Sequence, residues 1–172
     1  MPTSCAANRR FVTLSLQETR PNSILDLGCG RGDYGYMIRR YLPDRVKLYG
    51  LDGYMPYLVS DFCRKYDILV RADLFDLVDG RISIPVDCVL CMDVIEHLEK
   101  DKAMRLSEWL LKQPLSYMST PLFWFEQDPS YGNDLEKHKC HFTFDELVAM
   151  GWKPLAKVRW DSRGWIGAFK NA

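Results

Sequence analysis

The chain has 172 residues, of which 47% are hydrophobic and 13% aromatic, so it can bury one core but is short for two independent domains. Its 23 basic and 23 acidic residues cancel to a formal net charge of zero. That balance excludes a global field that would attract nucleic acid or anionic lipid, and we expect neither as a partner. We predict a single domain over residues 1–172.

The first fourteen residues, MPTSCAANRRFVTL, lack the apolar core of a signal peptide, and no stretch approaches the ~18 consecutive apolar residues of a membrane span. We therefore expect a cytoplasmic protein whose six cysteines are reduced. Cys88 and Cys91 have C-x-x-C spacing. Within a strand, however, an offset of three places side chains on opposite faces, so we predict buried thiols here and not a metal or redox pair.

Helix and strand patterns alternate along the chain. The predicted helices span residues 7–19, 33–42, 56–66, 95–113 and 142–152. The predicted strands span residues 23–28, 47–53, 67–74, 83–94, 115–121, 153–160 and 165–171. This alternation predicts an α/β fold with a seven-stranded, mostly parallel sheet and helices on both faces. Only DSRG joins the last two strands, which is too short for a crossover helix, so they form an antiparallel hairpin at one edge. Thr143, with Glu146 three residues later, is the predicted N-cap of the last helix.

A carboxylate and alternate glycines follow the first predicted strand. The stretch SILDLGCGRGDYG places Asp26 just before Gly28, Gly30 and Gly32. Glycine permits positive φ and lets a ligand approach the main chain, and the loop after the first strand is where open parallel sheets bind ligands. Through Gly30, Gly32 and Gly35 the stretch also matches the dinucleotide fingerprint. A carboxylate, however, is unfavourable beside a pyrophosphate and suits an ammonium or sulfonium ligand.

LDLGCGRG resembles the first motif of the class I S-adenosylmethionine-dependent methyltransferases. The resemblance implies a Rossmann-like fold with a C-terminal antiparallel strand. It also implies that Asp26, Cys29 and the surrounding glycines hold the methionine part of S-adenosylmethionine. It extends over roughly residues 7–170 in coarse organisation.

Three later motifs resemble the same family in order. LYGLDG places Asp52, followed by Gly53, where the family's acidic residue accepts hydrogen bonds from the ribose hydroxyls. RADLFDL implies an adenine-binding position for Asp73, with Leu74 offering its main-chain amide. VLCMDVIEHLEK resembles the fourth-strand motif, which implies that Asp93 and the residues beyond it close over the cofactor.

Each of these residues has an alternative structural interpretation. Asp52 and Asp73 could be helix caps or turn residues. Asp93 and Glu96 could favour the N-terminus of the following helix, where negative side chains are stabilised by ~0.3–1 kcal/mol. The spacing of Asp52 from the glycines also suits a dinucleotide-binding dehydrogenase.

Residues 121–142 form an irregular, aromatic insertion after the fifth predicted strand, and we expect it to make one wall of an acceptor pocket. Trp124 could stack on a planar acceptor or pack beneath the loop. N-x-x-E-x-H resembles a subset of these methyltransferases, with Asn133, Glu136 and His138 in matching places. Asn133 and His141 are further substrate-binding candidates.

Methyl transfer from a sulfonium depends on near-attack geometry, and it needs a general base only if the acceptor loses a proton. We predict that His138 or His97 is that base; the alternative is that each histidine only secures a loop by hydrogen bonding. His138, Cys140 and His141 resemble zinc ligands, but a fourth ligand and regular spacing are missing, so we predict no metal.

The sequence therefore predicts a methyltransferase that uses S-adenosylmethionine, yields S-adenosylhomocysteine and acts on a small-molecule acceptor. One alternative is a non-catalytic module that binds S-adenosylmethionine and contacts a protein partner. Another is a nicotinamide-dependent oxidoreductase, which would bind NAD.

Overall fold

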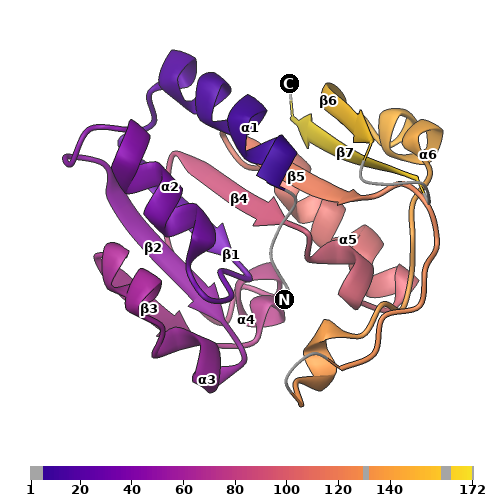
Figure 1. Ribbon diagram of the computed structural model, residues 1–172, viewed down its shortest axis with the longest axis horizontal. Helices are drawn as coiled ribbons and strands as arrows, with labels where there is room; N and C mark the ends of the chain where they lie inside the picture. The colour runs from indigo at the N-terminus through magenta and orange to yellow at the C-terminus, as the bar shows by residue number, and fades with distance from the viewer. Residues whose placement is uncertain (1–5, 130–131, 160–163, 172) are drawn as a thin grey trace.

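In the computed structural model, which describes residues 6–129, 132–159 and 164–171, helices pack on both faces of one seven-stranded sheet (Figure 1). The helices are α1 (Ala6–Thr19), α2 (Asp33–Tyr41), α3 (Met55–Leu58), α4 (Leu74–Val78), α5 (Lys100–Leu111) and α6 (Phe144–Ala149), with the 3-10 helices η1 (Asp61–Lys65), η2 (Ile95–His97) and η3 (Asp134–Glu136). The strands are β1 (Ser23–Leu27), β2 (Lys47–Asp52), β3 (Ile68–Arg71), β4 (Cys88–Met92), β5 (Ser116–Pro121), β6 (Lys153–Arg159) and β7 (Trp165–Lys170).

The strand order is β3-β2-β1-β4-β5-β7-β6. β7 lies between β5 and β6 and runs antiparallel to both, whereas all the other paired strands are parallel. The predicted mostly parallel sheet with a C-terminal hairpin is therefore confirmed. The tip of that hairpin, predicted as DSRG, lies mostly outside the described residues. Strand order reverses beside β1, whose neighbours are β2 and β4, and this is the point where ligand sites form in open parallel sheets.

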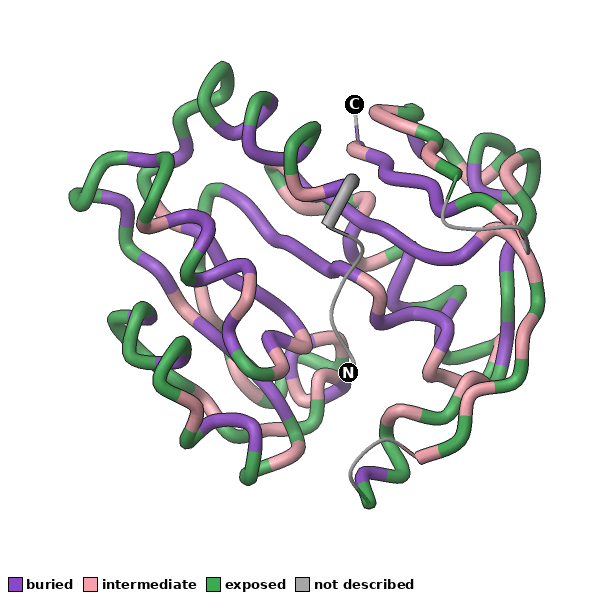
Figure 2. The backbone as a smooth tube through the Cα atoms, in the orientation of Figure 1, coloured by how far each residue is buried: buried purple, intermediate pink, exposed green. Residues whose placement is uncertain are grey.

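The sheet separates two hydrophobic cores because alternate side chains of each strand point to opposite faces. Cys88 and Leu90 pack with the core beneath α1 and α2, whereas Val89 and Cys91 pack with the core beneath α4, α5 and α6. β4 is buried along its whole length, and β1 is buried from Ile24 to Leu27 (Figure 2). The prediction that Cys88 and Cys91 are buried on opposite faces is therefore confirmed. All five cysteines in the described part of the chain are free thiols.

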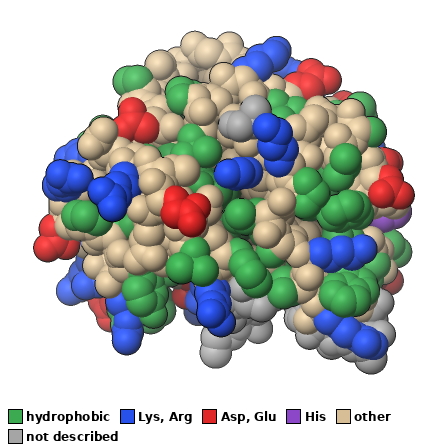
Figure 3. Space-filling model, turned by 90° about the horizontal axis from the view of Figure 1, so that it is seen from above, with side chains coloured by type: hydrophobic (Ala, Val, Ile, Leu, Met, Phe, Trp, Pro, Cys, Tyr) green, Lys and Arg blue, Asp and Glu red, His purple; other side chains and the backbone are tan. Residues whose placement is uncertain are grey.

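In the view of Figure 3, Lys and Arg side chains stand among acidic and hydrophobic ones. Among the described residues, no helix combines the length and the apolar character needed to cross a bilayer.

The structure corrects the prediction of one helix over residues 56–66. The segment forms α3 and then η1, separated at Val59 and Ser60. Ser60 is extended, and its hydroxyl accepts a hydrogen bond from the Phe62 amide, so it starts a new helix instead of continuing the first.

Two predicted strands are shorter than their apolar patterns. The third ends at Arg71, because Asp73 caps a short helix, α4, that we did not predict. The fourth begins only at Cys88, after an irregular segment that contains Pro85. Proline lacks the amide proton that a central strand must donate.

The predicted helix over residues 95–113 is also interrupted. Between η2 and α5, Leu98 is extended and Glu99 is the non-helical N-cap of α5. The carbonyl of Glu96 accepts hydrogen bonds from the amides of Lys139 and Cys140, at 2.8 and 3.2 Å, instead of from the next helical turn. A contact with the insertion thus breaks the helix.

Candidate functional site

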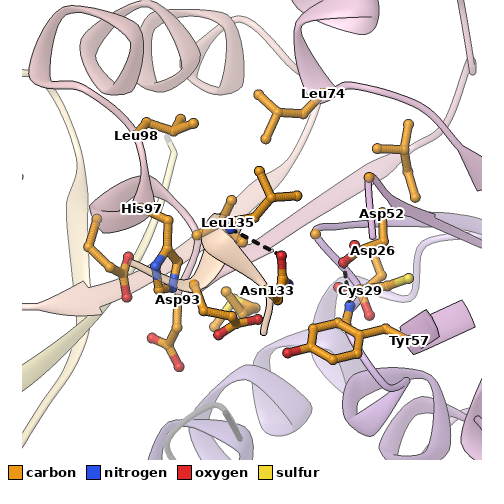
Figure 4. Close-up of a pocket in the computed structure, with 18 of the residues that line it drawn as sticks. Asp26, Cys29, Asp52, Tyr57, Leu74, Asp93, His97, Leu98, Asn133 and Leu135 are labelled. Carbon is orange, nitrogen blue, oxygen red and sulfur yellow. Dashed lines mark hydrogen bonds between the residues drawn. The ribbon is translucent and has the colours of Figure 1, made fainter. Parts of the chain in front are cut away.

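A pocket of about 770 Å³ opens where β1, β2 and β4 end. This volume lies within the range of ~300–1,000 Å³ that is usual for ligand pockets. In Figure 4, Asp26, Cys29, Asp52 and Tyr57 lie at one end and Asp93, His97 and Leu98 at the other, with Asn133 and Leu135 between them. The insertion thus borders the pocket, although its residues 130 and 131 lie outside the described ones.

The glycine loop after β1 forms part of the pocket floor. Gly28 and Gly30 have positive φ angles of 71° and 53°, which residues other than glycine rarely adopt. A Cβ at Gly28 would lie 2.6 Å from the Val94 side chain, whereas one at Gly30 would meet no atom within 4 Å. Gly28 is therefore required for packing, and Gly30 leaves the main chain open to the pocket.

Asp52 ties this loop to the end of β2. One carboxylate oxygen accepts a hydrogen bond from the Gly30 amide at 2.8 Å, and the other accepts one from the Tyr54 amide at 2.8 Å. Burial raises the pKa of Asp52, while these two amides oppose that shift. The side chain lines the pocket, so the same carboxylate shapes the loop and faces the ligand space.

Asp26 lies beneath the loop, inside β1, and is 2% exposed. The Tyr66 hydroxyl donates a hydrogen bond to it and accepts one from the Gly35 amide. Burial raises the pKa of Asp26 to about 7, and the Tyr66 hydrogen bond opposes the shift. A cationic ligand in the pocket would favour the ionised form of this carboxyl group.

Asp73 and Leu74 line the pocket beyond β3, and Gly53 lines it beyond β2. Asp73 also caps α4, because its carboxylate accepts a hydrogen bond from the Phe75 amide at 2.9 Å. The capping interpretation of Asp73 is confirmed, and the residue still borders the pocket. Its cofactor role stays a prediction.

Asp93 sits where β4 ends, with a positive φ of 56° that is rare outside glycine. Its carboxylate accepts a hydrogen bond from the Ser119 hydroxyl at 2.6 Å, and its amide donates to the Ser119 carbonyl. These contacts hold the strained turn and direct the chain from β4 into the residues that follow.

Glu96 is a pocket residue for which we predicted only a helix-terminus role. It is 2% exposed, and its carboxyl group accepts a hydrogen bond from the Thr120 hydroxyl at 3.1 Å. Burial, reinforced by the negative charge of Asp93, raises the pKa of Glu96 well above its usual value. The sequence offers no local signal for this burial.

His97 and His138 both line the pocket, with ring centroids 5.0 Å apart. Nδ1 of His97 lies 3.2 Å from the Lys137 carbonyl, and Nδ1 of His138 lies 3.1 Å from the Phe125 carbonyl. Burial lowers the pKa of His97 to about 4, with a further contribution from His138, and burial also lowers the pKa of His138. Both rings are therefore neutral near pH 7.

Three predicted site residues lie outside the pocket. Gly32, with φ of 91°, packs against the backbone of Phe62 and Cys63 and caps α2. Trp124 is 49% exposed and lies 6.0 Å, between ring centroids, from the exposed His141. Both aromatic residues are exposed, and neither lines the pocket.

Asn133 is 3% exposed and lines the pocket. Its side-chain oxygen caps η3 by accepting a hydrogen bond from the Leu135 amide at 3.0 Å.

The pocket wall also includes Tyr57 and Arg31, which the sequence analysis missed. The Arg31 guanidinium lies 5.4 Å from the centre of the Tyr57 ring. Burial raises the pKa of Tyr57 to about 12.

The pocket as a whole is acidic. Its carboxyl groups outnumber its basic side chains; the acidic residues are Asp26, Asp33, Asp52, Asp73, Asp93, Glu96, Glu99 and Glu136, and the basic ones are Arg31, Arg71, Lys102 and Lys139. Such a lining favours a ligand with positive charge and disfavours one with a pyrophosphate.

Solved structures with the same architecture were found by comparison. A bacterial methyltransferase domain, CtHen1-C, matches with a TM-score of 0.62 and 19% identity, over 96% of this chain and 97% of that one. This is the Rossmann-like class I methyltransferase fold. Magnesium protoporphyrin IX methyltransferase from Synechocystis PCC 6803 with bound SAM matches with a TM-score of 0.63 and 14% identity, over 95% of this chain and 77% of that one. A SAM dependent methyltransferase from Archaeoglobus fulgidus matches with a TM-score of 0.57 and 15% identity, over 95% and 94% of the two chains. No protein-family model and no curated protein sequence matches the chain.

Proposed function

We propose that the protein is an S-adenosylmethionine-dependent methyltransferase that acts on a small-molecule acceptor. The observation that carries this proposal is the acidic pocket at the switch point of a class I methyltransferase fold, with the glycine loop tied to Asp52 at its floor. The sulfonium and ammonium groups of the cofactor carry positive charge, which matches the excess of carboxyl groups. The pyrophosphate of NAD would face the same carboxyl groups at a cost.

The proposed cofactor contacts follow the order of the strands. The methionine part lies over Asp26, Gly28, Cys29 and Gly30, the ribose hydroxyls donate to Asp52 beside Gly53, and the adenine lies near Asp73 and Leu74. Asp93 closes the pocket from the end of β4. Gly32 acts differently, by holding the start of α2 and so the position of the loop.

The proposed reaction is an in-line displacement. A lone pair of the acceptor forms a bond to the methyl carbon while the electrons of the carbon–sulfur bond stay on sulfur, which yields S-adenosylhomocysteine. An acceptor that carries a proton must also lose it. His97 and His138 are neutral and border the pocket, so either can take that proton as general base. Asn133 is the proposed polar contact of the acceptor from the insertion.

Calorimetric titration with S-adenosylmethionine, S-adenosylhomocysteine and NAD tests the cofactor assignment. We expect both sulfur nucleotides to bind and NAD not to bind. Asp52→Asn should weaken S-adenosylmethionine about tenfold to a hundredfold, because a hydrogen bond to a charged group contributes ~1.5–3 kcal/mol. Asp61→Asn is the matched control, because the Asp61 side chain is 86% exposed and does not line the pocket. Tighter binding of NAD than of S-adenosylmethionine would overturn the proposal, and binding without turnover of any acceptor would favour the non-catalytic module.

A further inference from the structure

Glu96, His97 and His138 bring one carboxylate oxygen and two imidazole nitrogens to within 4.8 Å of one another at the edge of the pocket. Two ligand atoms on one ion, each at about 2.1 Å, lie at most about 4.2 Å apart, so a small side-chain adjustment closes the group around a cation. We infer that these three residues form a binding site for a divalent transition-metal ion.

The hydrogen bonds of the two histidines fix the tautomer of each ring, and this tautomer is one that can bind a metal. A carbonyl oxygen only accepts hydrogen bonds, so Nδ1 of His97 carries the proton that it donates to Lys137, and Nδ1 of His138 donates likewise to Phe125. In each ring Nε2 then keeps its lone pair. Metal-binding histidines are typically oriented by such a bond from the second ring nitrogen to a carbonyl or carboxylate.

Glu96 supplies the negative charge of the site. Its carboxyl group is 2% exposed, and its hydrogen-bond donor, the Thr120 hydroxyl, is neutral. A buried carboxylate is costly unless a cation compensates its charge. A divalent ion between Glu96 and the two histidines provides that compensation.

The backbone holds the three ligands in place before any ion binds. The carbonyl of Glu96 accepts hydrogen bonds from the amides of Lys139 and Cys140, which anchors the end of the insertion to η2. His138, from the insertion, is thereby fixed beside His97, from η2. This contact joins residues about forty positions apart. It explains why our prediction of no metal, which considered His138 only with Cys140 and His141, did not anticipate the site.

The donor set selects the kind of ion. Two imidazoles and one carboxylate suit first-row divalent transition metals, and three protein ligands leave coordination positions open, as in catalytic sites. Those positions border the pocket. If the proposed methyl transfer holds and the acceptor atom is an oxygen, a metal here would bind that oxygen and favour loss of its proton. The histidines would then be ligands and not general bases.

Titration of the chelator-treated protein with Co²⁺, followed by visible absorption, tests the site. We expect one equivalent to bind with a ligand-field band. Glu96→Gln, His97→Ala and His138→Ala should each weaken Co²⁺ binding at least about tenfold. The matched control is His141→Ala, which removes an exposed histidine outside the pocket and should leave Co²⁺ binding unchanged.

A second measurement needs no variant and so does not depend on variant folding. In nitrogen NMR spectra of the wild-type side chains, Zn²⁺ should shift the Nε2 resonances of His97 and His138 and leave those of His141 in place. Wild-type protein that gives neither the Co²⁺ band nor the Nε2 shifts would overturn the inference, as would variants that bind Co²⁺ like wild type. If such protein still binds S-adenosylmethionine, the metal site fails while the proposed function stands.

Discussion

The substitution Asp26→Asn tests how much the ionised carboxylate of Asp26 destabilises the folded protein, because it removes the charge but keeps the packing of the side chain. Burial raises the pKa of Asp26 to about 7 from the usual 3.8. Asparagine has nearly the same shape, and its oxygen can accept the hydrogen bond that Tyr66 donates. It carries no charge at any pH, so the variant removes the cost of an ionised group at this position.

The sign and size of the effect follow from proton linkage. Between pH 4 and pH 7 the folded wild-type protein binds more protons than the unfolded chain, because the pKa of Asp26 is higher in the folded state. The contribution of Asp26 to wild-type stability therefore falls as the pH rises through this window, by up to about 1.4 kcal/mol per pH unit. Between pH 5 and pH 8 the contribution amounts to about 2.5 kcal/mol.

Urea denaturation at pH 5 and pH 8 measures this contribution. The free energy of unfolding of Asp26→Asn, relative to wild type, should rise by about 2.5 kcal/mol between the two pH values. The exposed Asp61→Asn control should keep a constant difference from wild type. Equal pH profiles for wild type and Asp26→Asn would refute the assignment of a costly buried charge.

The same variant links stability to the proposed function. Binding of cationic S-adenosylmethionine should lower the pKa of Asp26, so wild-type affinity should increase as the pH rises through about 7, with release of a proton. Asp26→Asn should bind more weakly and lose this pH dependence. Calorimetry in buffers of different ionisation enthalpy measures both effects, and affinity that is independent of pH in wild type would contradict them.

Two further substitutions test the local structure by urea denaturation. Gly32→Ala should lower the free energy of unfolding by more than about 2 kcal/mol. The left-handed backbone of this position alone costs an alanine ~1–2 kcal/mol. In addition, the new Cβ would lie 2.8 Å from the Phe62 backbone and 2.9 Å from the Cys63 amide nitrogen. Gly80→Ala is the control, because Gly80 has a φ of 72° and a Cβ there would meet no atom within 4 Å. It should lose only the stability that the left-handed backbone costs. Equal losses of stability in the two variants would exclude the steric argument. Thr143→Ala should cost ~1 kcal/mol by removing the capping box of α6, and Thr143→Ser should retain most of that stability.

The sequence by itself determined the features whose signals are local. Alternating apolar patterns located all seven strands, and the short DSRG connection required β6 and β7 to pair antiparallel. The place of β7 beside β5 came only from the structure. The positions of Asp52 and of the glycines after the first strand placed the pocket at the carboxyl ends of the strands. The capping box at Thr143 was equally readable, because all its atoms lie within four consecutive residues.

Only the tertiary structure decided which side chains meet in the pocket. The burial of Glu96 and the approach of His97 to His138 depend on contacts between η2 and the insertion. The Glu96 carbonyl accepts from the amides of Lys139 and Cys140, and the His97 ring is hydrogen-bonded to the Lys137 carbonyl; no local pattern encodes these contacts. The same contacts break the helix predicted over residues 95–113. Gly32, by contrast, matched a binding motif but serves packing, because η1 lies against it in the folded chain. Contacts between segments distant in sequence form only when the sheet brings the ends of its strands together.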